Sequence, residues 1–308
     1  MTSAFDLKHA VSRSLLLASL AIPPEPRARI LRWQKGLRER RSLAGSDVVV
    51  LSFPKSGRTW FRVMLSRVYA ITYGLDRDAP LDGANFHRRE PRVPSVFFTH
   101  GNYRDEMSRG RDLTPMFAPK KIIFLVRHPA DAAVSLYFHN LGGRVDPIKR
   151  RMKRMPESME GISVGDFVLD PRWGVPAVIA YLNFWRGFLA HCPHTLMVRY
   201  EDLRTDPQTV LERIAAFLGE TFPPRAVAEA IESSSLERLR EQERRGDFKS
   251  PVMRMRDPSD PNSVKVRRGK MGGYVDYLDA AQVATIERLI TDGLDPAFGY
   301  GSQATVVG

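Results

Sequence analysis

The chain has 308 residues, a formal net charge of +12 and an isoelectric point near 10.0, which together predict an acidic partner. Hydrophobic residues make up 43% of it, no apolar run is long enough to cross a bilayer, and the single cysteine, Cys192, excludes an intramolecular disulfide or a thiolate metal cluster. The basic residues form separate groups without a recognised nucleic-acid motif, so we expect no nucleic acid among the partners.

Residues 1–46 precede the first predicted strand and form an N-terminal helical extension. Apolar spacing predicts two helices in it, over Ala10–Ile22 and Ala28–Leu43. The second carries apolar residues among many arginines. We favour a helix that packs on the rest of the chain, and the alternative is a basic amphipathic surface that makes peripheral contact with an anionic membrane.

Short β-branched or aromatic runs predict buried strands, and apolar residues at helical spacing predict helices between and after them. The strands are expected at Val48–Phe53, Val96–Thr99, Ile122–Val126 and Thr195–Arg199. The helices are expected at Trp60–Tyr73, Pro129–Leu141, Pro176–Leu189, Pro207–Leu218 and Ala280–Leu289. Because apolar strands that alternate with helices are typical of a parallel sheet covered on both faces, we predict an α/β fold over residues 47–300, followed by a tail over 301–308.

The segment that follows the first strand predicts an anion-binding site. The strand breaks at Pro54, turns through Ser56-Gly57 and enters a helix near Thr59. Backbone N–H groups in such a turn and at a helix N-terminus converge on phosphate, and Lys55 adds positive charge. The order of residues differs from that of a Walker A loop, in which Lys is followed by the Ser or Thr that holds magnesium.

Four short motifs occur in order along residues 54–274. They are PKSGRTW over 54–60, RHPADAAVS over 127–135, RYEDL over 199–203 and RRGKMGGY over 267–274. They resemble the 5′-phosphosulfate loop PKSGTTW, the 3′-phosphate signature R-x-P-x-D-x-x-x-S, the YEDL element and the RKGxxGDW segment of sulfotransferases that use 3′-phosphoadenosine 5′-phosphosulfate (PAPS). The chain departs from that pattern at Arg58 and at Gly273-Tyr274. The resemblance implies a P-loop-like three-layer fold with a central parallel sheet flanked by helices and, as in cytosolic and bacterial members, a cytoplasmic location.

The resemblance also implies roles for individual residues in nucleotide binding. The 5′-phosphosulfate would be lined by Lys55, Ser56, Gly57, Arg58, Thr59 and Trp60. The 3′-phosphate would be bound by Arg127, Ser135, Arg267, Arg268 and Gly269, and the adenine would be contacted by Tyr200, Ser234 and Leu236. An arginine can hold phosphate oxygens bidentately, which suits the assignment of Arg127.

His100 is the predicted general base, and Lys55 is predicted to stabilise the leaving oxygen. His100 ends the apolar strand in SVFFTHG, which resembles the family's KTHLP strand end with its catalytic histidine. A neutral imidazole can accept a proton near neutral pH. The competing candidates are His87, His128 and His139 and, because some branches of the family use a carboxylate, Asp105 and Glu106.

The resemblance implies in-line transfer of a sulfuryl group from PAPS to an acceptor hydroxyl or amine, without a metal. The acceptor, whether small molecule, lipid or glycan, and the oligomeric state stay open. Polar stretches at Tyr73–Arg92 and Gly142–Gly165 are expected to form the acceptor pocket, and Gly246–Lys265 is expected to be a loop or lid. One alternative is a nucleotide kinase, which would need magnesium and a Gly-Lys-Ser/Thr loop that this sequence lacks. Another is an inactive module that binds anions or lipids without turnover.

Overall fold

The computed structural model describes residues 22–77, 79, 81–141, 147–245 and 269–301. The predicted helix Ala10–Ile22, apart from Ile22, lies outside these residues, as do Gly246–Lys265 and all but the first residue of the tail over 301–308. Among the described residues, no helix is both long and apolar enough to span a membrane.

Four parallel strands form the sheet, in the order β2-β1-β3-β4. Their bounds are β1 (Val48–Ser52), β2 (Val96–Thr99), β3 (Lys121–Val126) and β4 (Thr195–Arg199). β2 and β4 have the predicted bounds, and the other two strands differ from the prediction by one residue at one end. The predicted parallel α/β sheet is therefore confirmed.

Helices surround the sheet. Those up to β4 are α2 (Pro24–Ala44), α3 (Arg58–Tyr73), α4 (Arg104–Ser108), α5 (Thr114–Phe117), α6 (Pro129–Leu141), α7 (Pro147–Met152), α8 (Val164–Leu169) and α9 (Val175–Leu189). After β4 come α10 (Tyr200–Thr205), α11 (Pro207–Leu218), α12 (Pro224–Ser233), α13 (Leu236–Arg245), the 3-10 helix η2 (Gly273–Tyr277), α14 (Ala280–Gly293) and η3 (Pro296–Phe298). All the predicted helices within the described residues are present.

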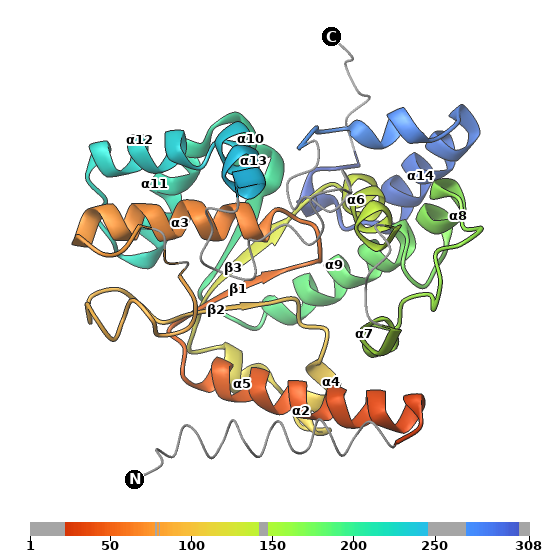
Figure 1. Cartoon of the computed structure of the whole chain (residues 1–308), viewed down its shortest axis with the longest axis horizontal. Coiled ribbons are helices and arrows are strands. Elements are labelled where there is room, and N and C mark those ends of the chain that lie inside the picture. The colour runs from red at the N-terminus through yellow and green to blue at the C-terminus, as the bar shows by residue number, and fades with distance from the viewer. Residues whose placement is uncertain (1–21, 78, 80, 142–146, 246–268, 302–308) are drawn as a thin grey trace.

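Both faces of the sheet are buried, because successive side chains of a strand point to opposite faces. In β1, Val49 and Leu51 join one hydrophobic cluster with residues of α6, α9 and α14, whereas Val48 and Val50 join a second cluster with residues of α3, α11 and α12. Figure 1 shows these two groups of helices on opposite sides of the strands. The predicted three-layer arrangement is confirmed.

Helix α2 packs against the chain as favoured from its sequence. It contacts α4, α5, α7 and β2. At Gly36 a Cβ atom would lie 2.5 Å from the Cβ atom of Glu106, so only glycine permits this approach of α2 to α4. Its Glu39 is buried and accepts a hydrogen bond of 2.9 Å from the Thr99 hydroxyl at the end of β2. Membrane contact by the N-terminal segment stays a prediction.

Candidate active site

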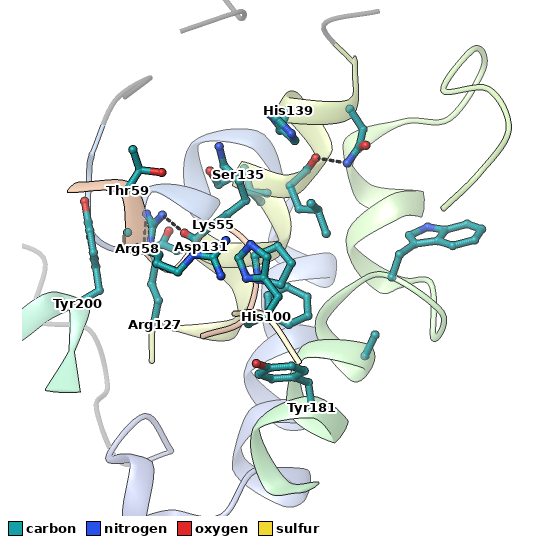
Figure 2. A pocket seen from close by; sticks show the side chains of 18 of the residues that line it. Lys55, Arg58, Thr59, His100, Arg127, Asp131, Ser135, His139, Tyr181 and Tyr200 are labelled. Carbon is teal, nitrogen blue, oxygen red and sulfur yellow. Dashed lines mark hydrogen bonds and ion pairs between the residues drawn. The ribbon is translucent and has the colours of Figure 1, made fainter. Parts of the chain in front are cut away.

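The residues that follow the four strands meet at one edge of the sheet. Lys55 follows β1, His100 follows β2, Arg127 follows β3 and Tyr200 follows β4. Because the strands are parallel, their carboxyl ends share this edge, which is the usual ligand-binding edge of open α/β sheets. The four side chains line one cavity of about 510 Å³, with His100 between Tyr200 and Tyr181 in the view of Figure 2.

The turn between β1 and α3 exposes the start of a helix to this cavity. Lys55 and Gly57 have positive φ angles of 72° and 84°, and no side chain caps the N-terminus of α3. At Gly57 a Cβ atom would lie 2.5 Å from the ring of Tyr200, so any side chain there would collide with that ring. An uncapped helix N-terminus beside a lysine can bind an anion, as the sequence predicts.

Arg127 joins the turn to the C-terminal segment. Its Nη1 donates to the carbonyl of Lys55 (3.1 Å), its Nη2 donates to the carbonyl of Lys270 (3.3 Å), and its guanidinium lies 4.5 Å from the centre of the Tyr200 ring. Asp131, one helical turn later, accepts hydrogen bonds from the backbone N–H groups of Gly272 (2.8 Å) and Tyr274 (3.1 Å). Two residues of one motif thus hold the last motif against the cavity. Sequence reasoning missed this role of Asp131, whose only clue was the aspartate in R-x-P-x-D.

Most of the residues expected at the nucleotide form what we name the phosphate-loop wall. It consists of Lys55, Gly57, Thr59, Trp60, Arg127, Ser135, Tyr200, Leu236 and Gly269, all of which line the cavity. Ser56 and Ser234 are buried but do not line it. The hydroxyl of Ser234 donates to the carbonyl of Ala230, and its own carbonyl accepts a 2.7 Å hydrogen bond from the Trp60 indole. Arg267 and Arg268 lie outside the described residues.

His100 is held in one tautomer by the end of β1. Its Nδ1 lies 2.8 Å from the carbonyl oxygen of Ser52. Because a carbonyl oxygen only accepts, Nδ1 carries the proton and Nε2 keeps its lone pair. Burial, followed by the positive charge of Arg58, lowers the pKa of His100 well below 6.5. The imidazole is therefore neutral at physiological pH and able to accept a proton.

The competing base candidates occupy different places. His139 also lines the cavity (Figure 2). His128 does not, and it stacks on Tyr274 with ring centroids 5.1 Å apart. His87, Asp105 and Glu106 are absent from the lining as well. Of the base candidates, His100 and His139 line the cavity, and which residue acts as the base stays a prediction.

The rest of the lining includes what we name the aromatic wall. Sequence reasoning named His100 and Arg58 of this wall individually and covered Lys153 and Met155 only as part of a longer stretch. It consists of Phe53, Arg58, His100, Asn102, Lys153, Met155, Arg172, Trp173 and Tyr181. The rings of Phe53 and Tyr181 meet edge to face, with centroids 5.2 Å apart. Lys153 and Met155 belong to the stretch Gly142–Gly165, part of which is helical rather than loop, and the role of this stretch in an acceptor pocket stays a prediction.

The other stretch expected at the acceptor pocket does not reach the cavity. No described residue of Tyr73–Arg92 lines the cavity, and Leu81 and Phe86 are buried in the hydrophobic cluster around α3. Because this stretch is mostly polar, sequence reasoning did not identify Leu81 and Phe86 as the apolar residues that hold it against α3.

The part of the chain that the structure describes holds no group of three or more His, Cys, Asp or Glu residues able to bind a metal ion. The expectation of metal-free chemistry stays a prediction.

Comparison with known proteins finds one matching family model and related sequences. The model of the sulfotransferase domain matches residues 45–296. Cytosolic sulfotransferase 17 of Arabidopsis thaliana is 26% identical over 269 residues, which cover 80% of this chain and 74% of that protein. Flavonol 3-sulfotransferase of Flaveria bidentis is 23% identical over 270 residues, which cover 81% and 82%.

Solved structures share the fold. Mouse sulfotransferase SULT7A1, in a complex with PAP, matches with a TM-score of 0.55 and 20% identity over 83% of this chain and 89% of its own. Retinol dehydratase, in a complex with retinol and PAP, matches with a TM-score of 0.55 and 18% identity over 86% and 84%.

Proposed function

The chain belongs to the sulfotransferase domain family, and from this premise we propose that it transfers a sulfuryl group from PAPS to an acceptor hydroxyl or amine. One observation carries the proposal. A single cavity at the edge of the sheet brings together an uncapped helix N-terminus, Lys55 and an imidazole that keeps a lone pair. An anion site and a base in one cavity are what transfer between an anionic donor and a hydroxyl requires.

The phosphate-loop wall fits a nucleotide with phosphates at two positions. The turn at Lys55–Gly57 would hold the 5′-phosphosulfate, and Arg127 with Ser135 would hold the 3′-phosphate. The Nε atom of Arg127 is buried without a hydrogen-bond partner among the described residues, so an incoming phosphate oxygen would satisfy it. Tyr200 and Leu236 would flank the adenine. Bound PAPS would supply the sulfuryl group, and the 5′-phosphate of the remaining nucleotide would be the leaving group.

Two side chains have proposed roles in the chemistry. Nε2 of His100 takes the proton of the acceptor hydroxyl, while the Nδ1–H bond to Ser52 keeps the ring in the required tautomer. The ammonium group of Lys55 stabilises negative charge on the leaving oxygen. We propose that neither step needs a metal, and a chelator should then leave turnover unchanged.

The names of similar proteins support a small-molecule acceptor. One relative is a flavonol sulfotransferase, and retinol dehydratase was solved with retinol. We therefore propose a small hydroxylated acceptor and, because several relatives are named as cytosolic sulfotransferases, a cytoplasmic location.

The proposed function is tested with labelled PAPS and calorimetry. The protein should transfer label to at least one hydroxyl acceptor in the presence of EDTA, and it should bind adenosine 3′,5′-bisphosphate (PAP) far more tightly than adenosine 5′-monophosphate. Equal affinity for both nucleotides would contradict the assignment of Arg127 and Ser135. Tight PAP binding without transfer to any phenol, alcohol or amine would favour the inactive binding module.

A further inference from the structure

The aromatic wall presents buried hydrogen-bond donors that have no acceptor among the described residues. They are Nη1 of Arg58, Nε1 of Trp173 and the hydroxyl of Tyr181. All three residues line the cavity. A buried donor without a partner costs free energy, and a guanidinium costs more than a neutral group. A ligand that brings acceptor oxygens to this wall would remove that cost.

Arg58 lies on the acceptor side of the cavity, beside the proposed base. The charged and polar groups that act on it most are Arg62, Tyr181 and Glu39, and Arg58 is in turn the charge that acts most on His100. Burial and the neighbouring Arg62 lower the pKa of Arg58 to about 10, so the side chain keeps its positive charge at neutral pH. The guanidinium of Arg58 lies where the acceptor must bind, because the acceptor's hydroxyl has to reach His100 beside it.

The protein supplies little negative charge to this part of the cavity. Asp131 is the one acidic residue in the lining, within the described part of the chain, and it is engaged by the N–H groups of Gly272 and Tyr274. Glu39 is buried and does not line the cavity, and its carboxylate accepts a hydrogen bond from the Thr99 hydroxyl. Arg172, by contrast, is paired with Asp170 at 2.8 Å. Lys153 is the third positive charge of this wall, and Arg58 acts more strongly on His100 than Lys153 does. A ligand anion bound beside His100 would therefore best match the charge of Arg58.

Apolar side chains surround these donors. Phe53 and Tyr181 meet edge to face, Trp173 stacks on Phe167 with centroids 6.1 Å apart, and Met155 adds a further apolar surface. Such a wall suits an aromatic or aliphatic body that carries one charged group.

We propose that the acceptor of this sulfotransferase carries an anionic group, such as a carboxylate, in addition to the hydroxyl that is sulfated, and that Arg58 binds that group. The inference rests on the proposed sulfuryl transfer and adds the chemical class of the acceptor. Arg58 is then a determinant of acceptor specificity rather than a ligand of the phosphosulfate.

The test compares acceptors in which a carboxylate is replaced by a methyl group. The two pairs are 4-hydroxyphenylacetate with 4-ethylphenol, and 10-hydroxydecanoate with 1-decanol. We expect kcat/KM of the wild type to favour the acid by about 10- to 100-fold in at least one pair, the range for a hydrogen bond to a charged group. Arg58→Met should bring that ratio close to one, and Arg58→Lys should keep part of it, because lysine keeps the charge but not the planar fork.

Arg62→Met is the matched control. Arg62 lies one helical turn further along α3, pairs with Asp82 at 3.7 Å, stacks on Phe98 at 4.1 Å and does not line the cavity. Its substitution removes an arginine from the same helix and should leave the ratio unchanged. Melting temperatures of all variants show whether each one is folded.

The remaining outcomes are decisive in either direction. A wild type that prefers the neutral member of both pairs overturns the inference. An Arg58→Met variant that loses activity equally with acid and neutral acceptors also overturns it, because Arg58 would then act on the sulfuryl donor. If PAP binds but no acceptor is turned over, the proposed function fails separately. Calorimetry of the four compounds with the PAP-loaded protein then decides, because the acids must still bind more tightly than their neutral partners.

Discussion

The two walls of the cavity are built in different ways. The phosphate-loop wall comes largely from short motifs directly after strands, and backbone contacts such as those of Arg127 with Lys55 and Lys270 hold it together. The aromatic wall comes from single residues just after β1 and β2, from α3 and α9, and from the segments between α7 and α9. One ring contact within it joins Phe53 to Tyr181. We propose that the first wall holds the nucleotide and that the second sets the specificity for the acceptor.

The largest expected effect is a loss of turnover without a matching loss of PAP affinity, and it comes from a residue of the aromatic wall. His100→Ala removes the proposed base, so turnover of an alcohol should fall by about 10²- to 10⁴-fold, whereas PAP affinity should change little. The loss should shrink for acidic phenols, which need less help to lose their proton. Steady-state kinetics and calorimetry measure both quantities.

His87→Ala is the control for His100→Ala, because His87 bonds the carbonyl of Val93 outside the cavity. Near-normal turnover of an alcohol by His100→Ala would contradict the assignment. His139→Ala is then the next variant to measure, since His139 is the other histidine of the lining.

The next largest effect concerns the phosphate-loop wall and again compares the loss of turnover with the loss of PAP affinity. Lys55→Ala should lower kcat by about 10²- to 10³-fold, the usual result of removing one preorganised stabiliser of transition-state charge. PAP affinity should fall less, because the start of α3 and Arg127 still hold the nucleotide. Equal losses in turnover and in PAP affinity would mean that Lys55 only binds phosphate.

A third prediction concerns the close contact between Gly57 and Tyr200, two residues of the phosphate-loop wall. Gly57→Ala places a Cβ atom at positive φ and against the Tyr200 ring, so both the melting temperature and PAP affinity should fall. Gly74→Ala at the other end of α3 shares the positive φ of 66° but has no atom within 4 Å of the new Cβ. It should cost only the backbone strain of about 1–2 kcal/mol and leave PAP affinity unchanged.

If the two glycine variants weaken PAP binding equally, the contact between Gly57 and Tyr200 has no role in shaping the nucleotide site. Thermal unfolding followed by circular dichroism and titration calorimetry with PAP measure the two effects separately.

The smallest expected effect is on the pH profile. His100 must be neutral to act as the base, and burial holds its pKa well below 6.5. As the pH falls from about 8 towards 6, the neutral form persists, so kcat/KM for an alcohol should stay nearly flat and drop only as the pH nears the lowered pKa. An acid limb centred at or above 6.5 would show that another group, or a more exposed His100, controls the rate.

The sequence by itself determined the sheet, most of the helices and the phosphate-loop wall. Strand runs such as Ile122–Val126 are apolar throughout because both faces are covered, so they stand out without any knowledge of their neighbours. Lys55, Gly57 and Thr59 lie within five residues of one another, and local backbone geometry places a helix N-terminus without a side-chain cap beside the lysine, as the predicted anion site requires. Parallel strands then imply that Arg127 and Tyr200 join it at the same edge.

Only the tertiary structure decided the aromatic wall and the role of several motif residues. Tyr181, Trp173 and Lys153 have no shared motif, and packing of α9 and of the segments between α7 and α9 beside the end of β2 brings them together with His100. The Ser234 hydroxyl is directed to Ala230, and Tyr73–Arg92 is held against α3 by Leu81 and Phe86. These outcomes depend on side-chain contacts between residues far apart in the chain, and such contacts leave no periodic pattern in a single sequence.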